Sequence, residues 1–144
     1  MSLSDEALLQ LAHQARERAY APYSGFSVGA ALEADDGRVF TGCNVENASY
    51  PVALCAERGA VSAAVAAGAR RFVRVAVSTH ASEPVAPCGA CRQVLAEFGP
   101  HMRVVAQGSS GIVAWSLEDL LPARFVLRGT EADHDDSPHH EESR

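Results

Sequence analysis

Three cysteines and one glutamate have the residue types and spacing that a metal-dependent hydrolytic centre requires. Cys88 and Cys91 form a Cys-x-x-Cys pair directly after Pro87, and Cys55 lies upstream of them. A helix that begins near Cys88 places both thiols of this pair on one face, where they can share a metal ion. With Cys55 as a third ligand, the set suits tetrahedral zinc with its fourth position open to water. We therefore predict one zinc ion per chain, held by Cys55, Cys88 and Cys91.

Glu57 lies two positions after Cys55, too close in sequence to be a likely second ligand of the same metal ion. It is well placed to act as a general acid and base beside that ion. Both cysteine segments are expected to begin helices, and the N–H groups at helix N-termini favour thiolates. Three thiolates nevertheless leave a zinc centre with net negative charge. Arg58 and Arg92 lie close to the ligands in sequence and are expected to offset that charge by donating hydrogen bonds to sulfur; the alternative is that both are solvated surface residues.

Cys43 leaves one alternative open for the metal site. A fourth cysteine ligand would close the coordination sphere and make the site structural, leaving Glu57 without a role. The chain contains one Cys-x-x-Cys pair rather than two, which favours Cys43 as a small residue packed in a strand. None of the six histidines has ligand spacing to the cysteines.

Length and composition indicate a single domain over residues 1–128 followed by an acidic tail at 129–144. The chain has 144 residues, of which 47% are hydrophobic, so it can bury a sizeable core. The polar tail is expected to be disordered. The N-terminus lacks a signal peptide, and no apolar run reaches membrane-spanning length, so we expect a cytoplasmic protein with no membrane partner. The net charge of −6, without a basic stripe, argues against a nucleic-acid partner.

Hydrophobic periodicity and turn residues predict an α/β fold with a five-stranded mixed sheet and helices on both faces. Helices are expected at 5–20, 55–67, 88–98 and 116–121, with Ser4 and Ser116 as N-caps. Strands are expected at 26–34, 38–44, 72–78, 102–107 and, as a short one, 112–115. The first two strands form an antiparallel hairpin around Asp35-Asp36-Gly37, and the later strand–helix–strand order favours parallel pairing.

With these residues in view, the chain resembles the small homotetrameric, zinc-dependent cytidine deaminases, from the first helix to about Phe125. Zinc deaminases share a [His/Cys]-x-Glu motif and a Pro-Cys-x-x-Cys motif, with a non-ligand Glu as acid and base. The likeness to the nucleoside enzymes depends on five segments in order: Tyr23-Ser24-Gly25-Phe26-Ser27-Val28-Gly29-Ala30-Ala31, Asn44-Val45-Glu46-Asn47-Ala48-Ser49-Tyr50, Cys55-Ala56-Glu57-Arg58, Pro87-Cys88-Gly89-Ala90-Cys91-Arg92-Gln93 and Leu120-Leu121-Pro122-Ala123-Arg124-Phe125.

The resemblance implies a role for each matching residue and a three-layer α/β/α fold. Glu57 would shuttle protons and Arg58 would steady the thiolates. The remaining residues would bind or enclose the substrate: Phe26 on the pyrimidine, Asn44 and Glu46 on the ribose hydroxyls, Ala56 in the site, Ala48 and Tyr50 in an adjacent subunit's site, and Phe125 on a neighbouring subunit's base. Asn44 and Glu46 are two residues apart, so a strand end would point both to one side, although such residues also commonly cap turns.

The implied activity is hydrolytic deamination of cytidine and 2′-deoxycytidine to the uridine products and ammonia, in pyrimidine salvage. The implied assembly is a homotetramer whose active sites are shared between subunits. Two alternatives remain open: a related deaminase of nucleoside antibiotics or of guanine, and a structural zinc module that binds a partner.

Overall fold

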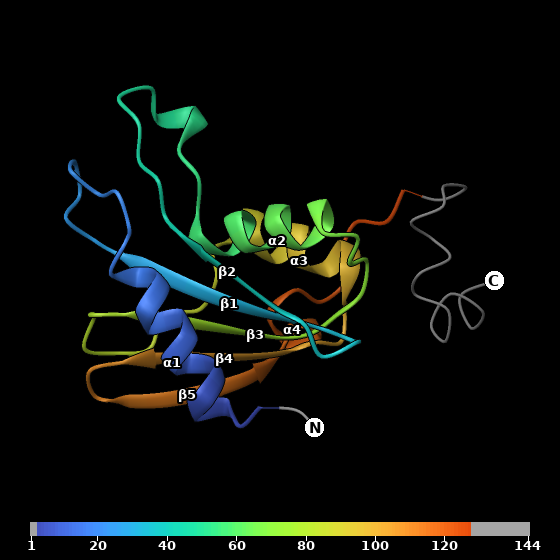
Figure 1. Ribbon diagram of the computed structural model, residues 1–144. Coiled ribbons are helices and arrows are strands. Elements are labelled where there is room, and N and C mark those ends of the chain that lie inside the picture. Colours follow the sequence, from blue (N-terminus) through green and yellow to red (C-terminus); the bar gives the residue numbers. More distant parts are fainter. Residues whose placement is uncertain (1–2, 128–144) are drawn as a thin grey trace.

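The computed structural model describes residues 3–127, which form a five-stranded mixed sheet with the strand order β2-β1-β3-β4-β5 (Figure 1). The strands are β1 (Val28–Ala34), β2 (Val39–Cys43), β3 (Phe72–Thr79), β4 (Arg103–Gly108) and β5 (Gly111–Ser116). Strands β3 and β4 are parallel, whereas the β1–β2, β1–β3 and β4–β5 pairs are antiparallel. The predicted five-stranded mixed sheet is confirmed. The predicted tail at 129–144 lies outside the described residues.

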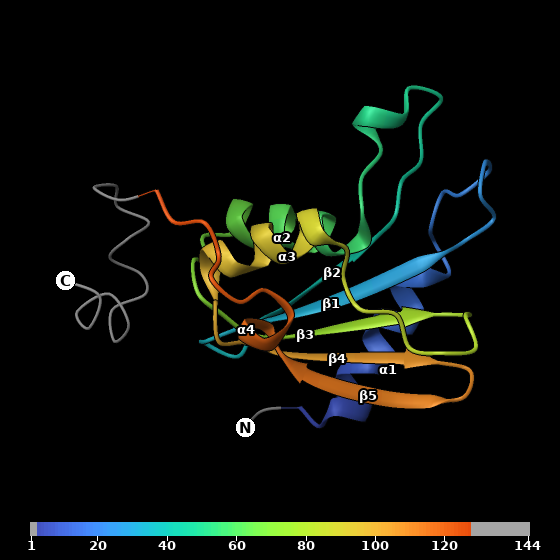
Figure 2. The same cartoon turned by 180° about the vertical axis from the view of Figure 1, so that it is seen from behind.

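Helices cover both faces of the sheet and give the predicted three layers. Helix α1 (Asp5–Arg16) lies on one face, and α2 (Ala56–Ala66) and α3 (Gly89–Phe98) lie together on the other (Figures 1 and 2). The short helices η1 (Tyr50–Val52) and α4 (Leu117–Leu120) belong to the connections. The sequence makes α2 rich in alanine, so its axis can lie close to the strands beneath it.

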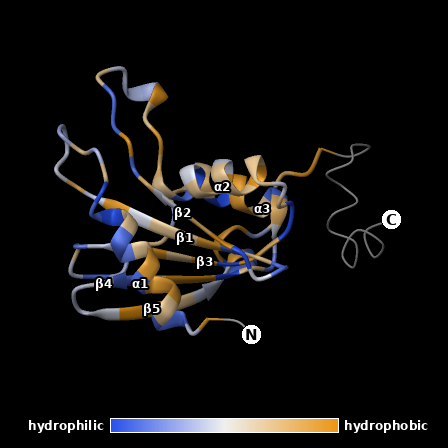
Figure 3. Cartoon of the chain, in the orientation of Figure 1, coloured by the Kyte–Doolittle hydropathy of each residue, from blue (hydrophilic) through white to orange (hydrophobic). Residues whose placement is uncertain are grey.

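Two apolar clusters hold the layers together, one on each face of the sheet. The smaller cluster joins α1 to the sheet through Leu8, Leu9, Ala12, Ala31, Ala76 and Val105. The larger one joins α2 and α3 to the opposite face and includes Leu32, Ala60, Val75, Leu95 and Val104. In Figure 3 the colour of hydrophobic residues recurs along the helices and the central strands. Burial of this surface is the main stabilising contribution that keeps the site-bearing helices in place.

The prediction that the first helix extends to Tyr20 is wrong, because α1 ends at Arg16. Ser4 does cap its N-terminus, and the Ser4 side chain accepts a hydrogen bond from the Ala7 N–H at 3.0 Å. Beyond Arg16 the chain turns, and the Tyr20 N–H donates to the Asn44 carbonyl at 3.0 Å while the Tyr20 carbonyl accepts from the Glu46 N–H at 2.8 Å. These bonds to a distant segment outweigh the local helical preference of residues 17–20.

Other predicted boundaries shift by smaller amounts. Strand β1 begins at Val28 rather than Phe26, because the Phe26 carbonyl accepts a hydrogen bond from the Asn44 side chain. Strand β5 is longer than predicted and pairs along the whole of β4. Ser116 occupies the N-cap position of α4, but its side chain makes no capping hydrogen bond. The described residues contain no helix long and apolar enough to cross a membrane.

Gly42 on β2 allows α2 to approach the sheet closely. A Cβ atom at Gly42 would lie 2.4 Å from the Ala56 carbonyl oxygen and 2.5 Å from the Ala60 nitrogen. Because backbone atoms cannot give way without moving α2, Gly42→Ala is expected to lower the free energy of unfolding by about 1–3 kcal/mol. Urea denaturation measures this change.

Gly59 provides the matched control, because it lies within α2 and a Cβ there would meet only ordinary contacts, the nearest at 3.6 Å. Gly59→Ala is expected to leave stability unchanged or to raise it by about 0.5–1 kcal/mol, since alanine favours the helix. Equal destabilisation by both substitutions would contradict the close approach of α2 at Gly42.

Candidate metal centre and active site

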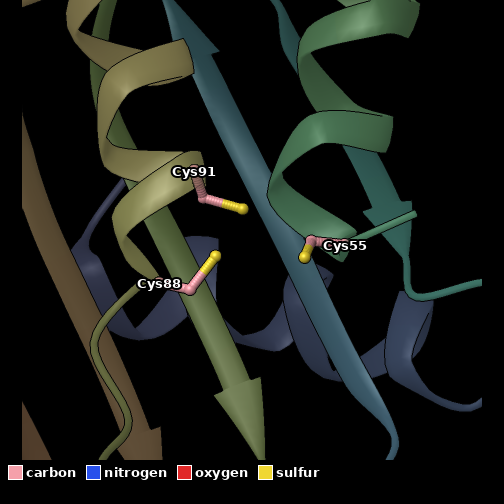
Figure 4. Close-up of side chains that lie close together, drawn as sticks. All are labelled: Cys55, Cys88 and Cys91. Carbon is pink, nitrogen blue, oxygen red and sulfur yellow. The ribbon is translucent and has the colours of Figure 1, made fainter. Parts of the chain in front are cut away.

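The fold brings the three predicted cysteine ligands together between α2 and α3. Cys55 is the N-cap residue of α2, and Cys88 is the N-cap residue of α3. Cys91 lies in the first turn of α3 and is fully buried. Figure 4 shows the three sulfur atoms converging from these two helix starts. Their Sγ atoms all lie within 4.8 Å of one another, which makes them a cluster that could hold a metal ion.

The donor set fits zinc in both size and chemistry. Three sulfurs of a tetrahedral zinc site lie about 3.8 Å apart for Zn–S bonds of about 2.3 Å, so the cluster needs only small side-chain adjustments. Burial, followed by the negative charge of Glu57, raises the pKa of the Cys91 thiol far above its ordinary value. A bound cation is what allows thiols so close together to be deprotonated at the same time.

Glu57 lies beside the cluster, in the first turn of α2, and is 5% exposed. It lines the same cavity as Cys55 and Cys88 but is not among the cluster of potential ligands. Burial raises the pKa of the Glu57 carboxyl, and a backbone hydrogen bond and the Arg58 charge offset only part of that shift. A carboxyl group whose protonated form is favoured by burial in this way can serve both as a proton acceptor and as a proton donor.

The two arginines next to the ligands behave differently. Arg58 donates a hydrogen bond from Nη2 to Cys55 Sγ at 3.4 Å, as expected. The Arg58 Nε atom is buried without a hydrogen-bond partner in the described structure. The prediction that Arg92 bonds to sulfur is wrong: Arg92 donates instead to the Pro87 carbonyl at 2.7 Å and to the Leu120 carbonyl at 2.8 Å. Arg92 therefore ties the segment before Cys88 to the end of α4.

Cys43 lies at the end of β2, and it is absent from the cluster that unites Cys55, Cys88 and Cys91. The described histidines are also absent from that cluster. His80 instead packs its ring against Phe26, with a centroid separation of 5.1 Å, and His101 pairs with Glu118 at 3.1 Å. The interpretation of Cys43 as a strand residue agrees with this geometry.

Asn44 and Glu46 both reach the cavity while holding the loop before β1. The Asn44 side chain accepts from the Val28 N–H and donates to the Phe26 carbonyl, both at 2.8 Å. The Glu46 carboxylate accepts from the N–H groups of Tyr23 and Ser24 and from the Ser24 hydroxyl. The hydrogen bond from the Ser24 hydroxyl is the main reason that the pKa of Glu46 is lowered. The capping role considered from sequence is thus present, and contacts with a sugar stay a prediction.

The remaining predicted substrate residues fall into two groups. Tyr50 and Ala56 line the cavity next to the cysteines. Ala48 is exposed, and Phe125 is 69% exposed and does not line it. Phe26 does not line it either, although its carbonyl is held by Asn44. Within one chain, therefore, the fold brings together the metal-binding cluster, Glu57 and the Asn44–Glu46 pair. Ala48 and Phe125 are exposed and lie outside the cavity lining.

The cavity has a volume of about 400 Å³, within the usual range for small-molecule sites. Sequence reasoning missed several of its walls. Thr79 and Val77 reach it from β3, and Val85 and Ala86 reach it from the loop before Pro87. Strand alternation could have found Val77 and Thr79, since they share a face. No local pattern marks Val85 or Ala86.

Comparison with known proteins identifies the same kind of centre. The sequence model described as the cytidine and deoxycytidylate deaminase zinc-binding region matches residues 2–107. A cytidine deaminase of Sporosarcina psychrophila is 54% identical over 122 residues, covering 83% of this chain and 90% of the relative. A cytidine deaminase of Mycobacterium tuberculosis is 46% identical over 116 residues, covering 81% and 85%.

A solved structure agrees in fold as well as in sequence. The cytidine deaminase crystal structure from Burkholderia pseudomallei superposes with a TM-score of 0.82 at 51% identity, covering 85% of this chain and all of that one. Together with the cysteine cluster at the two helix starts and Glu57 beside it, these matches identify the family: the chain belongs to the zinc-binding cytidine and deoxycytidylate deaminases.

Proposed function

We propose that this protein is a zinc-dependent cytidine deaminase that hydrolyses cytidine and 2′-deoxycytidine to uridine and 2′-deoxyuridine with release of ammonia. The observation that carries this function is the placement of Glu57 beside three convergent thiols, two of which, Cys55 and Cys88, line the same cavity as Glu57. The Asn44–Glu46 pair on the wall of the same cavity supports a nucleoside with its sugar attached. We assign the product to pyrimidine salvage.

Cys55, Cys88 and Cys91 would hold one zinc ion, which supplies a Lewis acid that lowers the pKa of water to near neutrality. Glu57 accepts a proton from the water that attacks C4 of the pyrimidine and delivers a proton to N3. It then takes the second proton from the hydroxyl formed at C4 and passes it to the amino group, so that C4=O forms as the C4–N bond breaks and ammonia leaves. Arg58 and the N-terminal ends of α2 and α3 offset the negative charge of the thiolates.

The substrate is a free nucleoside rather than a nucleic acid. Net charge is −6, and a polymer would require a row of cations to neutralise its phosphates. Asn44 and Glu46 can offer a donor and an acceptor to the sugar hydroxyls, and Phe26 can pack on the pyrimidine. Three of the four cysteines lie together as potential metal ligands rather than in disulfides, which supports a reducing, cytoplasmic location.

The decisive experiment combines ammonia release with zinc stoichiometry. Purified protein should contain one zinc per chain and release ammonia from cytidine and deoxycytidine at rates that barely depend on salt. Single-stranded oligonucleotides containing cytosine should remain unchanged. Release of ammonia from guanine but not from cytidine would favour the guanine-type alternative. Bound zinc without any deaminase activity would favour a structural module.

The proposal includes a homotetramer with shared active sites, supported by large exposed apolar residues. The segment that carries η1 stands out from the body of the chain beside the loop before β1 (Figures 1 and 2). On this segment Tyr50 is 73% and Val52 is 64% exposed. Phe125 is similarly exposed, and its carbonyl accepts a hydrogen bond from Gln93 on α3 at 3.1 Å. Large exposed apolar groups of this kind are typical of interaction surfaces.

Phe125→Ala tests whether this ring completes a neighbouring site. Stacking on one base contributes on the order of 1–3 kcal/mol, so KM for cytidine should rise by about one to two decades. The melting temperature should change little, because the ring is exposed within one chain. Leu127→Ala, which removes another exposed apolar side chain nearby in sequence, is the control for a general surface effect.

Steady-state kinetics and sedimentation measure both parts of this prediction. A fully active monomer would defeat the shared-site assembly. So would a Phe125→Ala enzyme with normal KM and a much lower melting temperature, since that result would make Phe125 a stability residue.

A further inference from the structure

A second cavity lies on the opposite face of the sheet, beneath the C-terminal half of α1. Its volume is about 370 Å³. Helix α1 contributes Gln10, His13 and Arg16, and the ends of β3 and β4 with the residues after them contribute Ser78, Thr79, His80, Gln107, Gly108 and Ser109. Only Thr79 is shared with the cavity that contains the cysteines. The established family activity gives this second cavity no role.

The cavity exists because the α1-facing surface of the sheet changes from apolar to polar at one end. Ala76 on β3 and Val105 on β4 pack against α1 in the smaller apolar cluster. The next residues on the same face of these strands are Ser78 and Gln107, which are register partners. A ligand that enters here meets the carboxyl ends of two parallel strands, a common position for binding sites in α/β proteins.

The lining of this cavity favours an anion. It contains one arginine and two histidines but no carboxylate, in a chain whose net charge is −6. Among the described residues, the Arg16 side chain makes no hydrogen bond or ion pair, so its guanidinium is available. Ser78 is 2% exposed and lines the inner end of this cavity from β3. A hydroxyl and a guanidinium that line the same cavity can together bind an oxygen-rich anion.

One feature of α1 opposes an anion, but it is the weaker effect. The C-terminal end of a helix carries a partial negative charge of about half an elementary charge. Here the last carbonyls are already occupied: the Ala15 carbonyl accepts from the Arg18 N–H at 3.0 Å and the Arg16 carbonyl from the Ala19 N–H at 3.1 Å. Arg16 carries a full positive charge, and imidazole and hydroxyl donors line the cavity with it. Their attraction for an anion exceeds the repulsion from what remains of the partial charge of the helix end. A cation would meet Arg16 without a compensating carboxylate.

We propose that this cavity binds the phosphate group of a small molecule. Arg16 supplies the charge, and His13, Ser78 and Ser109 can supply additional donors. The phosphate can come from inorganic phosphate or from a small phosphate ester, because the cavity is larger than the anion alone. His80 lines this cavity, and its ring contacts that of Phe26, the residue predicted to pack on the pyrimidine.

The test is a titration of the full-length, zinc-loaded protein followed by backbone amide NMR, with inorganic phosphate, ribose 5-phosphate and uncharged ribose as probes. Both phosphates should cause saturable shifts at Arg16, Ser78 and Ser109. Tighter binding of ribose 5-phosphate would identify an ester as the ligand, and equal binding would identify the free anion. Ribose should cause no shift at these amides. Arg16→Gln should weaken phosphate binding by about 10-fold or more, because it removes a charge-assisted contact.

Arg18→Gln is the matched control, because it removes the same charge from an exposed position outside the cavity. Arg18→Gln should weaken phosphate binding by no more than about threefold, because an exposed charge outside the cavity interacts only weakly with a bound anion. Three results would overturn the proposal: no saturable shift with either phosphate, shifts confined to amides around Cys55 and Cys88, or equal weakening by Arg16→Gln and Arg18→Gln. The second result would mean that phosphate binds only at the metal centre.

Discussion

Glu57→Gln is expected to lower kcat for cytidine by about 10²–10⁴-fold or more while the fold and the zinc content stay intact. The amide has nearly the same shape as the carboxyl group but cannot take a proton from water or deliver one to the pyrimidine. Because burial raises the pKa of Glu57, a neutral amide is well tolerated at this position, and the melting temperature should not fall. Single-turnover ammonia release, zinc content and thermal denaturation measure the three parts of this expectation.

Glu97→Gln is the matched control, since Glu97 is an exposed carboxylate on α3, away from the cavity. It should leave kcat within about twofold of the unchanged protein, as most surface substitutions have small effects. A Glu57→Gln protein that turns over cytidine normally would rule out Glu57 as the proton shuttle. Loss of zinc in Glu57→Gln would instead indicate that the carboxylate supports the metal.

Cys88→Ser is expected to abolish zinc retention and, with it, ammonia release. The serine hydroxyl is a poor zinc ligand at neutral pH, and only two thiols would remain in the cluster. Loss of a residue that merely supports a ligand costs about 10–100-fold in metal affinity, so loss of a ligand should cost at least as much. Elemental analysis after dialysis against a chelator measures zinc per chain, and the ammonia assay measures the loss of activity.

Cys43→Ser makes the same chemical change outside the cluster. It should retain one zinc per chain and nearly normal turnover. Equal loss of zinc in Cys43→Ser and Cys88→Ser would support the closed four-cysteine site that the sequence left open. Full zinc retention in Cys88→Ser would show that the metal is held elsewhere.

The local features of this protein follow from its sequence alone. Hydrophobic periodicity and turn residues are short-range signals, so the order and type of the helices and strands were predictable. The starts of α2 and α3 were predictable for the same reason, and with them the positions of Cys55 and Cys88 at helix N-termini. The Cys-x-x-Cys spacing also determined that Cys91 would lie one turn after Cys88.

Features that depend on distant segments came only from the tertiary structure. Tyr20 leaves the helix because its backbone hydrogen-bonds to Asn44 and Glu46, far along the chain. Arg92 bonds to the Leu120 carbonyl rather than to sulfur because α4 packs beside α3. The cavity under α1 combines residues from a helix and two strands, and no short sequence pattern contains all of them. Local preferences are worth less than about 1 kcal/mol per residue, so packing and hydrogen bonds between distant segments decide such details.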